Sequence, residues 1–399
     1  MWTAPDSQLH YTPDPGFYEA PVGFVPPPAR GDDDRFTRLR LIRSRRVGPA
    51  TYLRLLAEHG SAAAALDALP EVAKAAGVQG YEPCPEPVIK AELRAAARAG
   101  ARMLCLGDSE YPEHLATISD APPILWAMGQ TALMMRPCVA IVGTRNASSL
   151  GGRMVRKLAG ELGEAGFTIV SGLARGIDAL AHAASLDTGT IAVMAGGVDV
   201  VYPTENADLA ARITKAGLRL SEQPLGLQPQ ARHFPRRNRI VSGLAQGVIL
   251  IEAAARSGSL ITARLAADQG REVMAVPGHP MDSRASGGNI LLRDGATLVR
   301  SAEDVIEALG APGHIMRPAA PETAQAAPES ATPAVPSTDN SGPIEARILA
   351  VLGPVPTPED QLVRDLQTTP RDLAQALAVL ELSGHLRRAP GGMVHLTGS

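Results

Sequence analysis

The sequence predicts an α/β protein in which a parallel sheet with helices on both faces is flanked by a small helical domain and a winged helix. Between residues 101 and about 310, short apolar runs alternate with helix-length segments, as in a parallel sheet covered by helices. In residues 35–100 the apolar residues instead recur at helical spacing. Residues 343–399 predict three helices and a hairpin, which together form a winged helix.

The N-terminal region is predicted to change character near residue 34. Residues 1–34 carry many prolines and then Gly-Asp-Asp-Asp, without a periodic pattern, which favours a disordered tail. In residues 35–100, Phe36, Leu39 and Ile42 share one predicted helix face. The Arg-Arg-Val-Gly-Pro turn that begins at Arg45 is similar to a helix-hairpin-helix turn but lacks its usual second glycine. We expect a small SAM-like or helix-hairpin-helix-like domain, with a plain turn between packed helices as the simpler interpretation.

Seven apolar runs predict the strands of the central domain, residues 101–310. They are residues 139–142, 167–170, 191–194, 218–220, 248–251, 273–276 and 297–299. Nearly every run ends in glycine or a small polar residue, and ligands of open parallel sheets bind beyond the carboxyl ends of the strands. Residues 311–342 are rich in Ala, Pro, Ser and Thr and predict a flexible linker. In the last domain, Thr369 is expected to cap a helix that begins at Pro370.

Composition limits the possible functions. The 399 residues, with 45% hydrophobic and 20% charged residues, suit a globular protein with a large core, and the net charge of −3 requires any nucleic-acid surface to be local. No apolar run is long enough for a membrane span and the N-terminus does not resemble a signal peptide, so a cytoplasmic protein without membrane contact is expected. Cys84, Cys105 and Cys138 are widely spaced, which indicates buried thiols rather than a disulfide or zinc site.

The most informative stretch follows the first parallel strand. Gly143 permits a sharp turn, Thr144 and Arg145 follow it, and Ser148 or Ser149 can cap the next helix. Backbone amides and the helix dipole at such a turn favour an anion, and a guanidinium suits phosphate oxygens. Because this single glycine lacks the three-glycine dinucleotide spacing, an ordinary strand-to-helix turn fits equally well.

A second glycine turn follows the next strand. Ser171 and Gly172 end that strand, Arg175 lies in the turn, and Gly176 precedes a predicted helix. Asp178 lies in the first turn of this helix, where its carboxylate either interacts favourably with the helix dipole or orients an arginine.

Two further stretches begin helices. Residues 232–239, Arg-His-Phe-Pro-Arg-Arg-Asn-Arg, combine cations for a phosphate backbone with rings on which an unpaired base can stack, although a solvated arginine run with Phe234 in the core is the alternative. Ser257, Gly258 and Ser259 offer hydroxyls and amides at another helix start.

The ordered motifs together resemble the DprA/Smf family of DNA-processing proteins. The motifs are Ile-Val-Gly-Thr-Arg ending at Arg145, Ser-Gly-Leu-Ala-Arg-Gly-Ile-Asp ending at Asp178, Tyr-Pro-Thr-Glu-Asn from Tyr202, Ser-Glu from Ser221, Phe-Pro-Arg-Arg-Asn-Arg-Ile-Val-Ser-Gly-Leu from Phe234, Glu-Ala-Ala-Ala-Arg-Ser-Gly-Ser from Glu252, and Pro-Gly from Pro277. The resemblance spans roughly residues 111–299. It implies an extended Rossmann-like domain that binds single-stranded DNA, forms a homodimer and passes incoming DNA to the RecA recombinase during natural transformation.

The resemblance assigns the family's DNA-contact positions first to Arg145 and then to the run at residues 236–239, with the glycine turns shaping a pocket. With the turns found from the sequence, the candidate DNA-binding residues are Gly143, Thr144, Arg145, Ser171, Gly172, Arg175, Gly176, Phe234, Arg236, Arg237, Asn238, Arg239, Ser257, Gly258 and Ser259.

Enzymatic chemistry finds little support in the sequence. It has no Gly-x4-Gly-Lys-Ser/Thr phosphate loop and no His-Glu-x-x-His cluster, so we expect no catalytic residues, no metal and no cofactor. The rival interpretation is a nucleotide phosphoribohydrolase of the lysine-decarboxylase-like Rossmann type with Glu252 as acid/base, although its Pro-Gly-Gly-x-Gly-Thr motif is missing. A sequence-specific regulator is a weaker alternative, because Asp372 and Glu381 make the third helix of the winged helix a poor major-groove surface.

Overall fold

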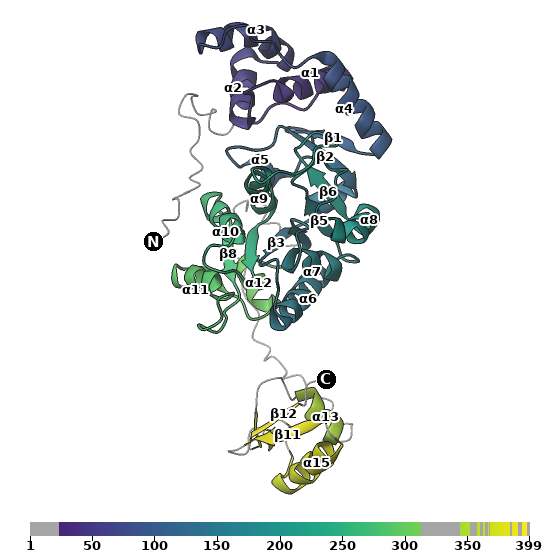
Figure 1. Cartoon of the computed structure of the whole chain (residues 1–399), viewed down its shortest axis with the longest axis vertical. Helices are drawn as coiled ribbons and strands as arrows, with labels where there is room; N and C mark the ends of the chain where they lie inside the picture. The colour runs from purple at the N-terminus through teal and green to yellow at the C-terminus, as the bar shows by residue number, and fades with distance from the viewer. Residues whose placement is uncertain are drawn as a thin grey trace, which may run out of the picture. The chain divides into compact units, whose positions relative to one another are not determined.

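The computed structural model describes residues 24–312, 344–351, 357–359, 362–363, 366, 368–383, 385–389 and 393–396. The chain divides into two compact units, Met1–Pro318 and Ala319–Ser399. The first holds a helical domain and a sheet domain, both visible in Figure 1. Most of the predicted linker, residues 311–342, lies outside the described residues.

The helical domain begins earlier than the sequence predicts. Its helices are α1 (Gly31–Arg43), α2 (Pro49–His59), α3 (Ala62–Ala75) and α4 (Glu86–Ala99). Three aspartates, residues 32–34, lie in the first turn of α1, where the helix dipole stabilises negative charge. Nη2 of Arg38 donates to the carbonyl of Pro27 at 2.9 Å, so the chain before α1 packs against it. Residues 24–34 are therefore part of the folded domain; residues 1–23 of the predicted tail lie outside the described residues.

The central domain is a nine-stranded, mostly parallel sheet. Its strands are β1 (Arg102–Cys105), β2 (Ile124–Gly129), β3 (Cys138–Val142), β4 (Thr168–Ser171), β5 (Thr190–Val193), β6 (Leu218–Ser221), β7 (Gly247–Leu250), β8 (Glu272–Ala275) and β9 (Thr297–Leu298). Their order is β1-β2-β6-β5-β4-β3-β7-β8-β9. The seven predicted strands are confirmed as β3 to β9, which pair in parallel.

The purely parallel sheet that the sequence predicts is extended by two antiparallel strands. β1 pairs with β2, and β2 pairs with β6 through the register Trp126↔Ser221. The chain order reverses at β3, since β4 to β6 lie on one side of it and β7 to β9 on the other. The loops after β3 and β7 therefore diverge at a switch point, where ligands of such sheets commonly bind.

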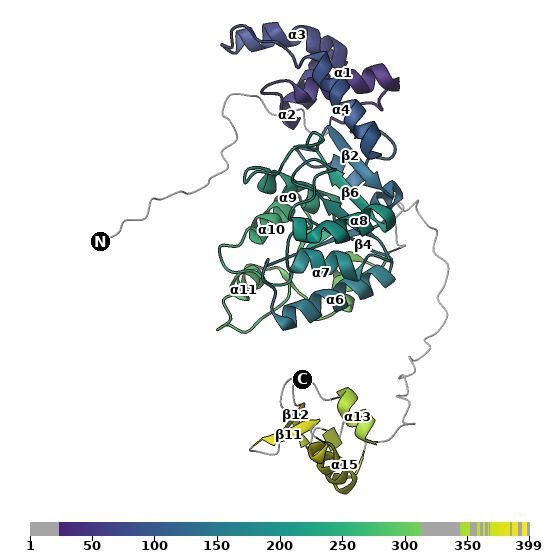
Figure 2. The same ribbon diagram turned by 45° about the vertical axis from the view of Figure 1, so that its right-hand side comes forward.

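Helices cover both faces of the sheet, as the sequence predicts. They are α5 (Glu113–Ala116), α6 (Ser149–Glu164), α7 (Ile177–Ala184), α8 (Ala207–Ala216), α9 (His233–Leu244), α10 (Ser259–Asp268), α11 (Ser286–Arg293) and α12 (Ala302–Leu309). Figures 1 and 2 show α9 and α10 on one side of the sheet and α6 to α8 on the other.

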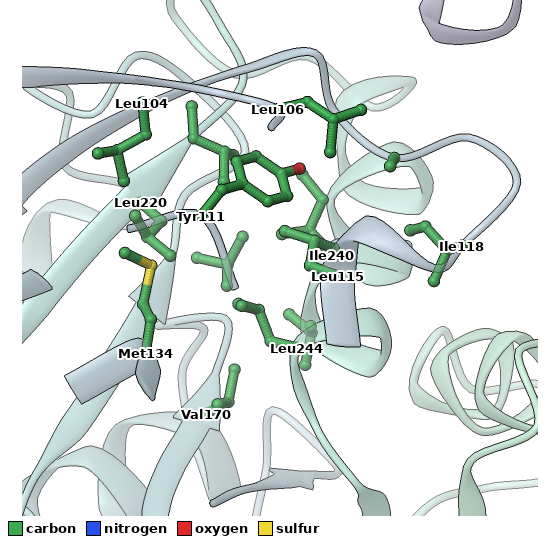
Figure 3. Packing of buried hydrophobic residues seen from close by; sticks show 14 of the residues in the cluster. Leu104, Leu106, Tyr111, Leu115, Ile118, Met134, Val170, Leu220, Ile240 and Leu244 are labelled. Atoms are coloured by element: carbon green, nitrogen blue, oxygen red, sulfur yellow. The ribbon is translucent and has the colours of Figure 1, made fainter. Parts of the chain in front are cut away.

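Alternate residues of each central strand enter different cores. In β3, Val139 and Ile141 pack with α6 and α7, whereas Ala140 and Val142 pack with α9 and α10. Figure 3 shows the α9 side, where Val170, Leu220 and Leu244 converge from β4, β6 and α9. Both faces being buried explains why these strands are continuous apolar runs.

In the second unit the described residues contain two of the three helices expected of a winged helix, together with its hairpin, whereas most of the segment between these two helices lies outside the described residues. Helices α13 (Ile344–Val351) and α15 (Pro370–Leu382) accompany a three-stranded antiparallel sheet of β10 (Thr357–Pro358), β12 (Met393–Leu396) and β11 (Leu386–Ala389). The predicted cap is confirmed, because the Thr369 side chain accepts from the amide of Asp372. Among the described residues of both units, no helix is both long and apolar enough to cross a membrane.

A buried carboxylate joins the helical domain to the sheet. Glu92 of α4 accepts from Nη2 of Arg43 in α1 and from Nε1 of Trp126 in β2, each at 2.8 Å. Both Glu92 and Trp126 are buried.

Replacing Glu92 with alanine should strongly destabilise the first unit. It would leave the Arg43 charge and the Trp126 N–H without their partner, at a cost of about 3–5 kcal/mol. Urea denaturation measures this change. Glu71→Ala is the control because its pair with Lys74 is exposed, and it should leave the unfolding midpoint unchanged. Equal effects of the two substitutions would contradict the structural role of Glu92.

Candidate nucleic-acid interface

A pocket of about 500 Å³ opens at the carboxyl ends of β3, β4 and β5. Three successive loops and the first turns of α9 meet there, as expected for adjacent parallel strands. Its lining residues are Arg145, Asn146, Gly172, Ala174, Arg175, Tyr202, Pro203, Phe234 and Arg237. Five of the predicted residues, Arg145, Gly172, Arg175, Phe234 and Arg237, are thus brought together.

The glycine turn after β4 is held by buried polar groups. The carboxylate of Asp178 accepts from the amides of Gly172 at 3.2 Å and Ala174 at 3.3 Å. Leu173 has a φ of +55°, in the left-handed region, and its amide donates to Nε2 of His182 at 3.3 Å. Nδ1 of His182 therefore carries the proton and donates to Oγ1 of Thr190 at 2.7 Å. These contacts fix the backbone that forms the pocket floor.

Arg237 is a buried cation on this floor. It is 8% exposed, and among the described residues its Nε has no hydrogen-bond partner. Its guanidinium occupies the space that a side chain at position 172 would need, so any larger residue there would displace the guanidinium from this position. Burial lowers the pKa of Arg237; Asp178 opposes this shift and Arg145 adds to it. An anion in the pocket would offset both unfavourable effects, because it would supply a hydrogen-bond acceptor and a negative charge.

Arg145 and two aromatic rings form the outer part of the pocket. Cζ of Arg145 lies 5.7 Å from the centre of the Phe234 ring, a cation–π distance. The rings of Phe234 and Tyr202 are 5.8 Å apart and inclined at 59°. Tyr202 is 50% exposed, so a flat ligand can reach it. Arg175, also exposed, pairs with Glu205 at 2.7 Å.

Other predicted residues support the pocket without lining it. The carbonyl of Thr144 accepts from the amide of Ile177, and Oγ of Ser171 donates to the carbonyl of Ile141. Gly176 has a φ of +73° and approaches the backbone of Thr144 and Arg145 closely, which joins the first two loops. Gly143, at the end of β3, likewise lies outside the lining.

The remaining candidates lie elsewhere. Ser257, Gly258 and Ser259 lead into α10, where the amide of Ser259 donates to Oγ of Ser257, and they do not line the pocket. Arg236 is exposed and Asn238 is half-buried on α9, and neither lines it.

Arg239 has a structural environment rather than one open to a ligand. Its guanidinium is 8% exposed and pairs with Asp120 at 3.2 Å and with Glu222. Both carboxylates raise its pKa against the effect of burial. Arg237 and Arg239 are two residues apart on a helix, so their side chains point in different directions. We therefore leave Arg239 out of the proposed interface.

The phosphate site predicted at the start of α6 already contains an anion. The carboxylate of Glu252, which follows β7, accepts from the amide of Ser148 at 2.9 Å and from its hydroxyl. Oγ of Ser148 accepts from the amide of Gly151, which confirms it as the helix cap. A carboxylate from the chain itself thus occupies the positive end of the α6 dipole at the switch point. The pocket lies beside this position, at the carboxyl ends of β3, β4 and β5.

The candidate list missed Tyr202, Pro203, Asn146 and Ala174. Tyr202 lies in the Tyr-Pro-Thr-Glu-Asn motif, which was the signal available in the sequence. Its pairing with Phe234 depends on the fold, because 32 positions separate the two residues.

Comparisons with known proteins give a consistent assignment. A family model described as DNA recombination-mediator protein A matches residues 102–310. Models of a DprA-like N-terminal HHH domain and a DprA winged helix domain match residues 32–95 and 319–392. These matches confirm the helix-hairpin-helix and winged-helix assignments.

Individual relatives agree with these models. DNA processing protein DprA of Bacillus subtilis is 44% identical over 226 residues, covering 56% of this chain and 76% of the relative. Protein Smf of Escherichia coli is 41% identical over 294 residues, covering 72% and 76%. The X-ray structure of DNA processing protein A from Streptococcus pneumoniae has a TM-score of 0.53 and 41% identity, covering 56% of this chain and 78% of that chain.

The buried His182 should make folding stability depend on pH. Burial lowers its pKa from 6.5 to about 3, so the unfolded chain gains a proton below about pH 6.5 while the folded chain stays neutral to about pH 3. Stability should therefore fall as pH drops through this window, by up to about 1.4 kcal/mol per pH unit.

Urea denaturation at several pH values tests this expectation. His182→Gln should flatten the pH dependence, whereas His279→Gln, at an exposed position, should not. An unchanged slope in the His182 variant would show that this ring does not control the acid response.

Proposed function

Since this chain belongs to the DNA recombination-mediator protein A family, also called DprA/Smf, we propose that it binds single-stranded DNA in the pocket over β3, β4 and β5. The observation that carries the proposal is the meeting of two guanidinium groups, Arg145 and Arg237, with the Phe234 ring in one pocket. Phosphates suit the guanidinium groups, and an unpaired base suits the ring.

Each group has a distinct role in this proposal. Arg237 is buried, and its Nε has no partner among the described residues; in this proposal it donates to a phosphate oxygen of the DNA. Arg145, which is exposed, contacts the DNA backbone from the solvent side. A base stacks on the Phe234 and Tyr202 rings, which a paired base inside a duplex cannot do. Because every nucleotide has a phosphate and a base face, we expect little sequence preference.

Binding without catalysis is the second part of the proposal. The phosphoribohydrolase alternative requires Glu252 as a free acid/base, whereas its carboxylate caps α6 through Ser148. The pocket residues are cations, rings and backbone, which suit holding a strand rather than cleaving a bond.

The proposed biological role is inferred from the family to which the chain belongs. Its description as a recombination mediator supports transfer of bound DNA to the RecA recombinase, and the DprA/Smf motifs support a role in natural transformation. Such a role places the protein in the cytoplasm. A homodimer is supported by exposed apolar side chains in the segment from β8 to β9: Met281, Ile290 of α11 and Leu298 of β9.

Substitution of the two pocket arginines tests this function. Arg145→Ala and Arg237→Ala should each weaken binding of an oligothymidylate by about 1.5–3 kcal/mol, the range for hydrogen bonds to charged groups. Arg145→Lys should recover only part of the loss because it lacks the planar fork. Fluorescence anisotropy measures the affinity and thermal melting measures the stability.

Arg239→Ala is the matched control on the same helix. It should lower the melting temperature, because Asp120 and Glu222 lose their partner, and should leave the affinity of the folded protein unchanged. A duplex of the same length should bind more weakly than the single strand. Equal affinity for the two, or equal effects of all three alanine substitutions, would contradict the proposed interface.

A further inference from the structure

A second, shallow hollow of about 570 Å³ adjoins the pocket. Its lining residues are Ala147, Ser148, Ser149, Gly152, Arg153, Arg156 and Leu180. Arg145 and Asn146 line the pocket and Ala147 begins the hollow, so one continuous stretch of backbone forms the border between them.

The hollow has a floor of small residues and a rim of cations. Ala147, Ser149 and Gly152 leave room above the start of α6. Arg153 and Arg156 are exposed and lie three residues apart on that helix, so their Cβ atoms are about 5–6 Å apart on neighbouring turns. Arg156 donates through Nη1 to the carbonyl of Gly152 at 3.0 Å. Within the described residues, Arg153 has no ion pair or hydrogen bond.

We propose that a bound single strand continues from the pocket across this hollow and lays its next phosphates on Arg153 and Arg156. The inference rests on the proposed function and adds the direction in which the strand leaves the pocket. Charge complementarity and the shared border support it. Two flexible guanidinium groups on successive turns can each meet one phosphate of an extended backbone.

A continuing strand fits the hollow better than a small anion does. The positive end of α6 is already occupied by the carboxylate of Glu252, and both arginines are exposed rather than buried. A free phosphate would therefore find only solvated cations, which bind weakly. A strand held in the pocket by Arg237 and Phe234 instead brings its next phosphates to these cations at high effective concentration.

Oligonucleotide length distinguishes this path from the pocket itself. An oligothymidylate of about four nucleotides fills the pocket only, whereas one of about twelve also spans the hollow. The double variant Arg153→Gln/Arg156→Gln should bind the longer strand about tenfold more weakly and the shorter strand as the wild type does. For the longer strand, the slope of log K against log salt should become shallower by about 1.4, which is two contacts at about 0.7 each.

Lys74→Gln/Arg264→Gln is the charge-matched control. Lys74 lies on α3 and Arg264 on α10, at exposed positions away from the hollow, and their replacement should change neither affinity nor slope. Unchanged binding of the longer strand by the α6 variant would overturn the path, as would equal weakening of both lengths. Failure of the wild type to bind even the shorter strand would contradict the proposed function itself.

Discussion

The close approach of Arg237 to the backbone of Gly172 is the constraint on which the proposed interface depends. Only a residue without a side chain allows the guanidinium to lie against the turn after β4. Two hydrogen bonds hold this turn in place: the amide of Gly172 donates to Asp178, and the amide of Leu173 donates to His182. Burial lowers the pKa of Arg237, and its Nε keeps an unused donor among the described residues, so the folded protein maintains an unfavourable cation that an anionic ligand relieves.

The position of Glu252 favours the proposed binding of a strand over that of a mononucleotide. Nucleotide-binding sheets of this type place a phosphate at the helix N-terminus beside the switch point. Here the carboxylate of Glu252 occupies that position on Ser148. Arg145 and Arg237 line the pocket, and Arg153 and Arg156 line the adjoining hollow on α6, so an extended backbone can pass from one pair to the other.

The sequence predicts the parallel strands well because five of them, β3 to β7, are buried on both faces and are therefore mostly apolar. It misses β1 and β2, because these antiparallel strands are defined by their pairing, β1 with β2 and β2 with β6, rather than by a local pattern. Five pocket residues were predicted because they follow strand ends or begin a helix: Arg145, Gly172, Arg175, Phe234 and Arg237. The different environments of Arg237 and Arg239 could not be predicted, since the partners of Arg239, Asp120 and Glu222, are distant in sequence. The same holds for the pairing of Tyr202 with Phe234.

A double-mutant cycle between positions 172 and 237 tests the central claim most directly. If Gly172 serves to seat the Arg237 guanidinium, Gly172→Ala should weaken oligothymidylate binding about as much as Arg237→Ala does. In the Arg237→Ala background, Gly172→Ala should then cause no further loss, so the coupling energy should equal about 1.5–3 kcal/mol, the effect of the single substitution. Additive losses would show that the two residues act independently, and would contradict the account of a glycine that holds a buried arginine ready for phosphate.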